Sequence, residues 1–125
     1  MNDNKKLINI QYLEDSDVNS NGTLTPGATS GKLTVCLLQG NFCGYCTSVK
    51  PMFQQFAQHN PNIQCVNIQI DGTASEKTAF QKISGLVEPG VPRFLFFSAD
   101  GKYLDFHKGD RTEEELLKSA NIFNK

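Results

Sequence analysis

The sequence predicts an α/β fold, and three stretches support this prediction. Residues 33–38 form an apolar run, which is typical of a central strand covered on both faces. A helical pattern follows from Cys43, and alternating apolar residues over 63–70 complete a strand, helix, strand unit. The unit has about the length that a right-handed parallel crossover needs. Residues 99–102 then carry a hairpin signal between two further strands.

The first third of the chain combines a short apolar segment with a long polar one. Residues 7–12 alternate between apolar and polar side chains, which predicts a strand. Residues 15–31 are rich in Asp, Asn, Ser, Gly and Thr and contain almost no large apolar side chain, so we expect a loop. A 17-residue loop is unusual inside a small domain. We therefore expect it to replace an element of structure or to contribute to binding.

The helix after Cys43 is expected to bury an aromatic-rich face. Val49, Phe53 and Phe56 recur at helical spacing and form this inner stripe, with Met52 beside it. A proline inside a helix removes one backbone hydrogen bond, but the apolar period continues beyond Pro51. We therefore predict a kink there, and an end at residues 60–61, where a second proline stands.

Capping signals mark the two later helices. Thr73 with Glu76 three positions on resembles a capping box and opens a short helix. An apolar strand over 91–97 follows, and its partner across the hairpin is expected at 103–106. Residues 112–115 form a second capping box, whose three glutamates suit the positive end of the last helix.

Length and composition limit the possible class of protein. A chain of 125 residues has room for one domain, over residues 1–125, and can bury about two thirds of its unfolded surface. A net charge of -1 gives no basic surface for nucleic acid, and no run of 18 apolar residues exists to span a membrane. The polar first residues do not resemble a secretory signal, and four cysteines suit a reducing compartment. We expect a cytoplasmic monomer.

Cys43 and Cys46 fall where a strand gives way to a helix. Two cysteines separated by two residues at a helix start can close a small disulfide. The unpaired N–H groups of the first turn favour the thiolate form of Cys43. A structural disulfide and half of a zinc site are the alternatives, but zinc needs a second close pair of ligands, which the sequence lacks. A redox pair is favoured, and Cys36 and Cys65 are expected to be buried small hydrophobes.

These residues together resemble the thioredoxin-fold disulfide oxidoreductases, from about Leu33 to the end of the chain. An aromatic residue precedes Cys-Gly-x-Cys over 42–46, and Pro51 follows the second cysteine by five positions. Gly-Val-Pro over 90–92 precedes an apolar strand. The Asp-Gly-Lys hairpin at 100–102 and a glycine before the last helix agree with the same pattern.

The resemblance implies a thioredoxin fold, with a mixed sheet between helices and with the loop 15–31 in place of the first helix. It implies a cis peptide bond at Val91-Pro92, packed against the cysteines. It also implies a protein-disulfide reductase in which Cys43 attacks and Cys46 resolves, without a metal or bound cofactor. A reductase that uses a reduced nicotinamide, or glutathione, would recharge the pair. The substrate is expected to contact Phe42, Gly44, Tyr45, Gly90, Val91 and Pro92.

The sequence departs from the family at three places near the cysteines. Leu37 stands where thioredoxins carry a buried aspartate, and Asn67 stands where they carry a lysine. Resolution by Cys46 should then be the slow step, unless water or an acid from elsewhere, such as Glu88, takes the proton of Cys46. The dipeptide between the cysteines is Gly-Tyr, which also resembles bacterial periplasmic disulfide isomerases. An isomerase or oxidase therefore remains an alternative, as does a binding module with incidental cysteines.

Overall fold

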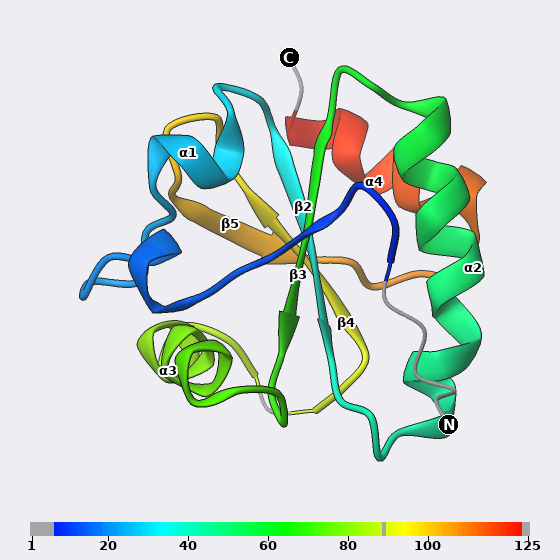
Figure 1. Cartoon of the computed structure of the whole chain (residues 1–125). Helices are drawn as coiled ribbons and strands as arrows, with labels where there is room; N and C mark the ends of the chain where they lie inside the picture. The colour runs from blue at the N-terminus through cyan, green and yellow to red at the C-terminus, as the bar shows by residue number, and fades with distance from the viewer. Residues whose placement is uncertain (1–6, 89, 124–125) are drawn as a thin grey trace.

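The computed structural model describes residues 7–88 and 90–123 and contains a five-stranded mixed β-sheet (Figure 1). The strands lie in the order β1-β3-β2-β4-β5. The first three of these run parallel, whereas β4 is antiparallel to β2, and β5 is antiparallel to β4. The strands are β1 (Gln11–Tyr12), β2 (Thr34–Gln39), β3 (Gln64–Gln69), β4 (Arg93–Phe97) and β5 (Tyr103–Phe106). The predicted α/β class and mixed sheet are confirmed.

Helices cover both faces of the sheet (Figure 1). On one face lie α2 and α4, and on the other lies α3, together with the short helix α1 and the 3-10 turn η1. The helices are α1 (Pro26–Thr29), α2 (Gly44–His59), α3 (Ala74–Ile83) and α4 (Glu113–Phe123), and η1 spans Asp15–Asp17. Each face of the sheet therefore has its own apolar core.

The central strand β2 divides its side chains between the two cores. Val35 and Leu37 pack in the core beneath α2 and α4, whereas Cys36 and Leu38 pack in the core beneath α3. All six residues of the strand are buried, as expected for a strand that is covered on both faces. Because side chains alternate along a strand, Gln39 lies on the same face as Leu37, under α2.

Local capping chemistry fixes the start of α3 as the sequence predicts, and one of the two hydrogen bonds of the predicted capping box is present at α4. The Thr73 hydroxyl accepts a hydrogen bond from the Glu76 N–H at 3.2 Å, and the Glu76 carboxylate accepts one from the Thr73 N–H at 2.7 Å. This reciprocal pair satisfies two N–H groups that have no acceptor within the helix. At the start of α4, Thr112 accepts a hydrogen bond from the Glu115 N–H at 3.2 Å.

The predicted strand over residues 7–12 is only partly correct. Two residues of it, Gln11–Tyr12, pair with β3. Asn9 has a φ of 61°, a left-handed conformation that interrupts the extended backbone. Leu7 and Ile10 are nevertheless buried in the core beneath α2. The alternation of apolar residues therefore reports burial correctly, although it does not report a continuous strand.

The segment 15–31 contains no long helix, but it is more structured than a loop. It holds η1 and α1, and an isolated bridge joins Val18 to Leu24. The ammonium of Lys82 on α3 donates to the carbonyl of Asp15 at 2.9 Å and to that of Val18 at 2.8 Å. The apolar side chains Val18, Leu24 and Ala28 are buried in the core beneath α3. These contacts join residues that are distant in the sequence. Local sequence patterns do not report such contacts, and they therefore predict a loop here.

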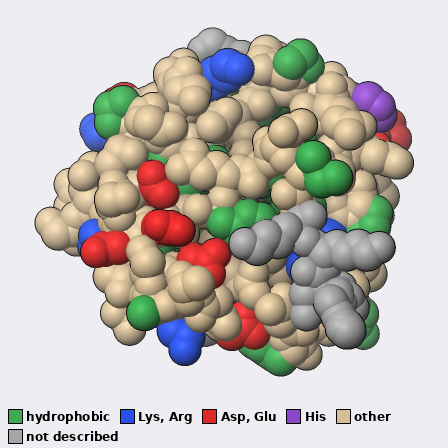
Figure 2. Space-filling model, viewed as in Figure 1, with side chains coloured by type: hydrophobic (Ala, Val, Ile, Leu, Met, Phe, Trp, Pro, Cys, Tyr) green, Lys and Arg blue, Asp and Glu red, His purple; other side chains and the backbone are tan. Residues whose placement is uncertain are grey.

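The visible surface is mainly polar. Figure 2 shows hydrophobic side chains scattered over this face and several acidic side chains gathered toward its left side. Over the described ranges 7–88 and 90–123, no helix has both the length and the apolar character needed to cross a bilayer.

Candidate active site

Cys43 is the N-cap residue of α2, immediately after the loop that leaves β2. Its sulfur accepts a hydrogen bond from the Cys46 backbone N–H at 3.1 Å. This N–H is one of the four at the helix start that have no acceptor within the helix. The Cys43 thiol also lies 3.8 Å from the carbonyl oxygen of Val91 and is half-buried. The sulfur is therefore held by the helix start while it remains accessible from solvent.

Cys46 lies on the inner face of α2 and is fully buried. Burial disfavours the thiolate and raises the pKa of Cys46 to about 12, and the hydrogen bond with the Cys43 side chain acts in the same direction. The backbone of Gly40 and the charge of Lys50 lower this pKa in part. Both thiols are free. The pair therefore combines one reachable sulfur with one sheltered sulfur.

The loop before Cys43 is anchored to the end of β3. The carboxylate of Asp71 accepts a hydrogen bond from the Asn41 N–H, with its two oxygens at 2.9 and 3.1 Å. The Cys43 N–H donates to the carbonyl of Gly40 at 3.3 Å. Hydrogen bonds to a charged acceptor are stronger than those between neutral groups. These contacts fix the turn that carries Phe42 and presents Cys43.

Residues 90–92 lie beside Cys43, although 48 positions separate Val91 from it in the sequence. The Val91-Pro92 peptide bond is cis, and Pro92 is buried. Gly90 has a φ of 122°, a conformation that side chains rarely tolerate, so glycine suits this position. The approach of the Val91 carbonyl to the Cys43 sulfur brings the predicted proline segment and the predicted nucleophile together.

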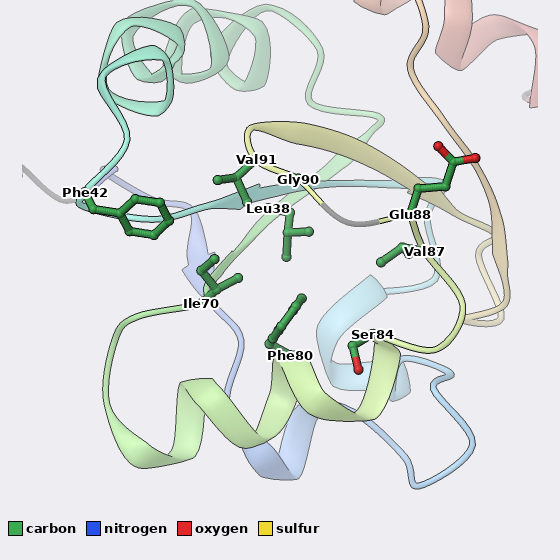
Figure 3. Close-up of a pocket in the computed structure, with 9 residues that line it drawn as sticks. All are labelled: Leu38, Phe42, Ile70, Phe80, Ser84, Val87, Glu88, Gly90 and Val91. Atoms are coloured by element: carbon green, nitrogen blue, oxygen red, sulfur yellow. The ribbon is translucent and has the colours of Figure 1, made fainter.

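An apolar pocket of about 570 Å³ opens next to this segment (Figure 3). Its walls come from the ends of β2 and β3, from α3 and from the segment that follows α3. The lining residues are Leu38, Phe42, Ile70, Phe80, Ser84, Val87, Glu88, Gly90 and Val91. Figure 3 shows the Glu88 carboxylate turned away from the cavity, which leaves the interior mainly apolar. Phe42 and Val91 therefore border both the pocket and the cysteine pair.

Two aromatic side chains are exposed around Cys43. Phe42 is 70% exposed and Tyr45 is 73% exposed, which is unusual for side chains of this size. Gly44, between the cysteines, is exposed as well and forms the first residue of α2. The six residues predicted to contact substrate thus all lie in the two segments that meet at Cys43.

The remaining cysteines lie in strands and away from the surface. Cys36 in β2 and Cys65 in β3 are buried, which confirms the prediction that they are small hydrophobes. Burial raises the pKa of Cys36 and raises the pKa of Cys65 to about 12. Both thiols are therefore protonated at neutral pH, and neither is a nucleophile that can compete with Cys43.

Sequence reasoning missed Lys50, which is only 8% exposed and lies on the inner face of α2. Its spacing of four residues from Cys46 places both side chains on one face of the helix. This spacing is the feature of the sequence that could have indicated Lys50. Glu88, the acid suggested as a proton acceptor, is 71% exposed, and its carboxylate lies 3.9 Å from Arg93. The geometry thus places a buried cation near Cys46 and leaves Glu88 at the surface.

Comparison with known proteins agrees with this geometry. The family model of thioredoxin matches residues 28–121. A putative thioredoxin-like protein of Invertebrate iridescent virus 6 is 22% identical over 111 residues, covering 77% of this chain and 80% of the viral protein. Because the family model covers most of the chain, the protein belongs to the thioredoxin family.

Solved structures share the same architecture. A thioredoxin from Fasciola hepatica superimposes with a TM-score of 0.60 at 25% identity, covering 74% of this chain and 82% of that one. Thioredoxin F from spinach chloroplast gives a TM-score of 0.69 at 14% identity, covering 97% of this chain and 99% of that one. The family and the fold support a role as a thiol-disulfide oxidoreductase.

Proposed function

We propose that the protein reduces disulfide bonds in protein substrates through Cys43 and Cys46. The observation that carries the proposal is the asymmetry of the pair. Cys43 is reachable and its sulfur accepts the Cys46 N–H, whereas Cys46 is fully buried one turn further along α2. An accessible nucleophile followed by a second thiol within reach suits thiol-disulfide exchange through a mixed disulfide.

The reaction proceeds through two exchanges. The Cys43 thiolate attacks one sulfur of the substrate disulfide, and a mixed disulfide joins Cys43 to that sulfur. The substrate S–S bond breaks, and its other sulfur leaves as a thiolate with the electron pair and takes a proton from water. The Cys46 thiol then loses its proton, and its sulfur attacks Cys43. The substrate sulfur that was bonded to Cys43 leaves with the bonding electron pair and takes a proton from water. The substrate gains two electrons, and the pair becomes the Cys43-Cys46 disulfide.

The substrate is held by backbone and by apolar contact. The segment 90–92 offers its main chain next to Cys43, so an extended polypeptide can add there as a short strand. The adjoining pocket then receives an apolar side chain from the residues that flank the substrate cysteine. Phe42 and Tyr45 supply exposed aromatic surface on the cysteine side of the same site.

The oxidised pair must be reduced before another turnover. A reductase that uses a reduced nicotinamide, or glutathione, fits this requirement, because either supplies the two electrons that the substrate has taken. The Gly-Tyr dipeptide between the cysteines favours a second candidate, a disulfide isomerase. The two candidates differ in the reduction potential of the pair, which is about -270 mV for thioredoxin and about -180 mV for protein disulfide isomerase.

Reduction of insulin by dithiothreitol tests the proposed function. Catalytic amounts of the wild-type protein should shorten the lag before the insulin B chain precipitates, and redox titration of the pair should give a potential well below -200 mV, roughly in the reductase range. The Cys36→Ala variant serves as the matched control and should behave as wild type. A potential near the isomerase value, together with slow insulin reduction, would favour the second candidate.

The Val87→Asp variant should weaken reduction of protein substrates without changing the reactivity of the cysteines. Val87 lines the pocket, and a carboxylate there opposes the burial of an apolar substrate side chain. Loss of one such contact corresponds to about 1.5–3 kcal/mol, so KM for insulin should rise about tenfold or more. Steady-state kinetics with insulin and with a small aromatic disulfide separate the two effects.

The same substitution at Leu86 provides the control for the pocket. Leu86 is half-exposed and lies outside the pocket lining, so Leu86→Asp adds an equal charge one residue away. We expect KM for insulin to stay near the wild-type value in this variant. Equal effects at the two positions would show that charge near the site matters and that the pocket does not receive a side chain.

A further inference from the structure

The buried face of α2 carries a lysine beside Cys46. Lys50 is buried together with Cys46, Val49, Phe53 and Phe56 along the same stripe of the helix. Residues four positions apart on a helix have Cβ atoms about 5–6 Å apart and point the same way, so Lys50 lies directly after Cys46 on this face. A lysine on such a stripe is unusual, because this residue is rarely buried.

The sheet opposite Cys46 supplies polar groups that do not titrate. Leu37 and Asn67 are register partners in β2 and β3, and both are fully buried on the face that α2 covers. Gln39, at the end of β2 on the same face, is fully buried too. Within the described residues, neither the Asn67 nor the Gln39 side-chain amide has a hydrogen-bond partner. These groups are dipoles without charge, so they cannot take the place of the carboxylate that the family carries at position 37.

We propose that Lys50 is the positioning residue for the resolving step, its charge stabilising the Cys46 thiolate as that sulfur attacks the mixed disulfide. This inference rests on the proposed function. In the step, Cys46 gives its proton to water, the Cys46 sulfur bonds to the Cys43 sulfur, and the bond from Cys43 to the substrate breaks. The substrate sulfur leaves with the electron pair and is protonated by water.

The effect of the Lys50 charge on the pKa of Cys46 has the direction that this role requires. The charge of Lys50 lowers the pKa of Cys46, against the opposite effects of burial and of Cys43. The titratable groups that act on Cys46 from its own helix are thus Cys43 and Lys50. In the sheet beneath α2, the phenol of Tyr12 in β1 is a further titratable group, and Tyr12 pairs in register with Asn67. Glu88, which precedes the Val91 segment, is exposed. In a poorly solvated site, a cation near a thiolate favours it far more than in water.

Release of nitrothiobenzoate from the aromatic disulfide dithiobis(nitrobenzoate) separates the two steps. Attack by Cys43 releases the first aromatic thiolate, and attack by Cys46 on the resulting adduct releases the second. In Lys50→Met, the first release should keep its wild-type rate. The second should slow about tenfold at neutral pH, and below the pKa of Cys46 each rate should equal the wild-type rate measured about one pH unit lower, since one unit of pKa is tenfold in thiolate. Lys50→Arg should stay close to wild type.

The outcomes distinguish this inference from the proposed function. A second release in Lys50→Met that equals wild type in rate and pH profile overturns the role of Lys50. Slowing in both Lys50→Met and Lys50→Arg with unchanged pH profiles also overturns it, because a structural role then explains the loss. If Lys50→Met does not fold, Lys50→Gln is measured instead. Failure of the first release in the wild type would count against the proposed function itself.

Discussion

The Cys43→Ser variant should lose all catalysis of disulfide reduction, whereas the Cys46→Ser variant should capture its substrate as a stable mixed disulfide. All four cysteines lie in the described part of the chain, and serine at position 43 removes the half-exposed one, while the other three are buried. Serine at position 46 keeps the attacking sulfur but removes the sulfur that releases the substrate. Insulin reduction should therefore fall to the rate of dithiothreitol alone in both variants. Non-reducing electrophoresis and mass spectrometry should show the Cys43 adduct in the second.

Two controls accompany these variants. Cys36→Ala and Cys65→Ala remove buried thiols from the strands and should leave the rate of insulin reduction near wild type, since neither sulfur reaches the site. An adduct on Cys46 in the Cys43→Ser variant, or substantial reduction by that variant, would reverse the assignment of attacking and resolving thiols.

The Leu37→Asp variant should release the mixed disulfide faster and should be markedly less stable. A carboxylate at this position restores the acid that the family carries behind the cysteines, and a positioned base contributes typically a hundredfold or more to a proton transfer. Leu37 is fully buried in the core beneath α2, so its replacement removes apolar packing and buries an ionisable group. We expect the free energy of unfolding to fall by about 3–5 kcal/mol. Denaturant unfolding and the lifetime of the Cys43 adduct measure the two effects.

The Leu37→Asn variant separates the effect of an added proton acceptor from the effect of lost apolar packing. Its side chain has nearly the shape of aspartate but cannot accept the Cys46 proton at neutral pH. This variant should lose a similar amount of stability without shortening the lifetime of the adduct. Equal adduct lifetimes in wild type and Leu37→Asp would mean that the site already has a proton acceptor and that position 37 is simply part of the core.

Elements whose signals are local could be predicted from the sequence. The capping box at Thr73 and Glu76 sets the start of α3, and the apolar run of β2 follows from burial on both of its faces. The segment 15–31 could not be predicted, because Lys82 and Gly101 fix it from elsewhere in the chain. The Leu24 N–H donates to the Gly101 carbonyl at 2.9 Å. An added Cβ at Gly101 would lie 2.2 Å from the Leu24 carbonyl oxygen, so this approach requires glycine.

The residues of the candidate site likewise divide into those that local spacing indicates and those that only the folded chain brings together. Spacing alone indicates Cys43 and Cys46, because the helix start itself supplies the relevant N–H groups. The pocket could not be predicted, since its walls come from four separate segments that meet only in the folded chain. Lys50 was missed for a different reason. A lysine in a helix is normally solvated, and its burial is visible only once α2 is packed on the sheet.

Helix α3, which forms one wall of the pocket, is anchored through Lys82 to the segment 15–31. One side of α3 presents Phe80 to the pocket, while Lys82 holds the carbonyls of Asp15 and Val18. The irregular segment 15–31 therefore holds in place the helix that a substrate side chain would contact. Changes of sequence or length in this segment offer a route to altered substrate preference, while the helix that carries the cysteines, on the opposite face of the sheet, stays as it is.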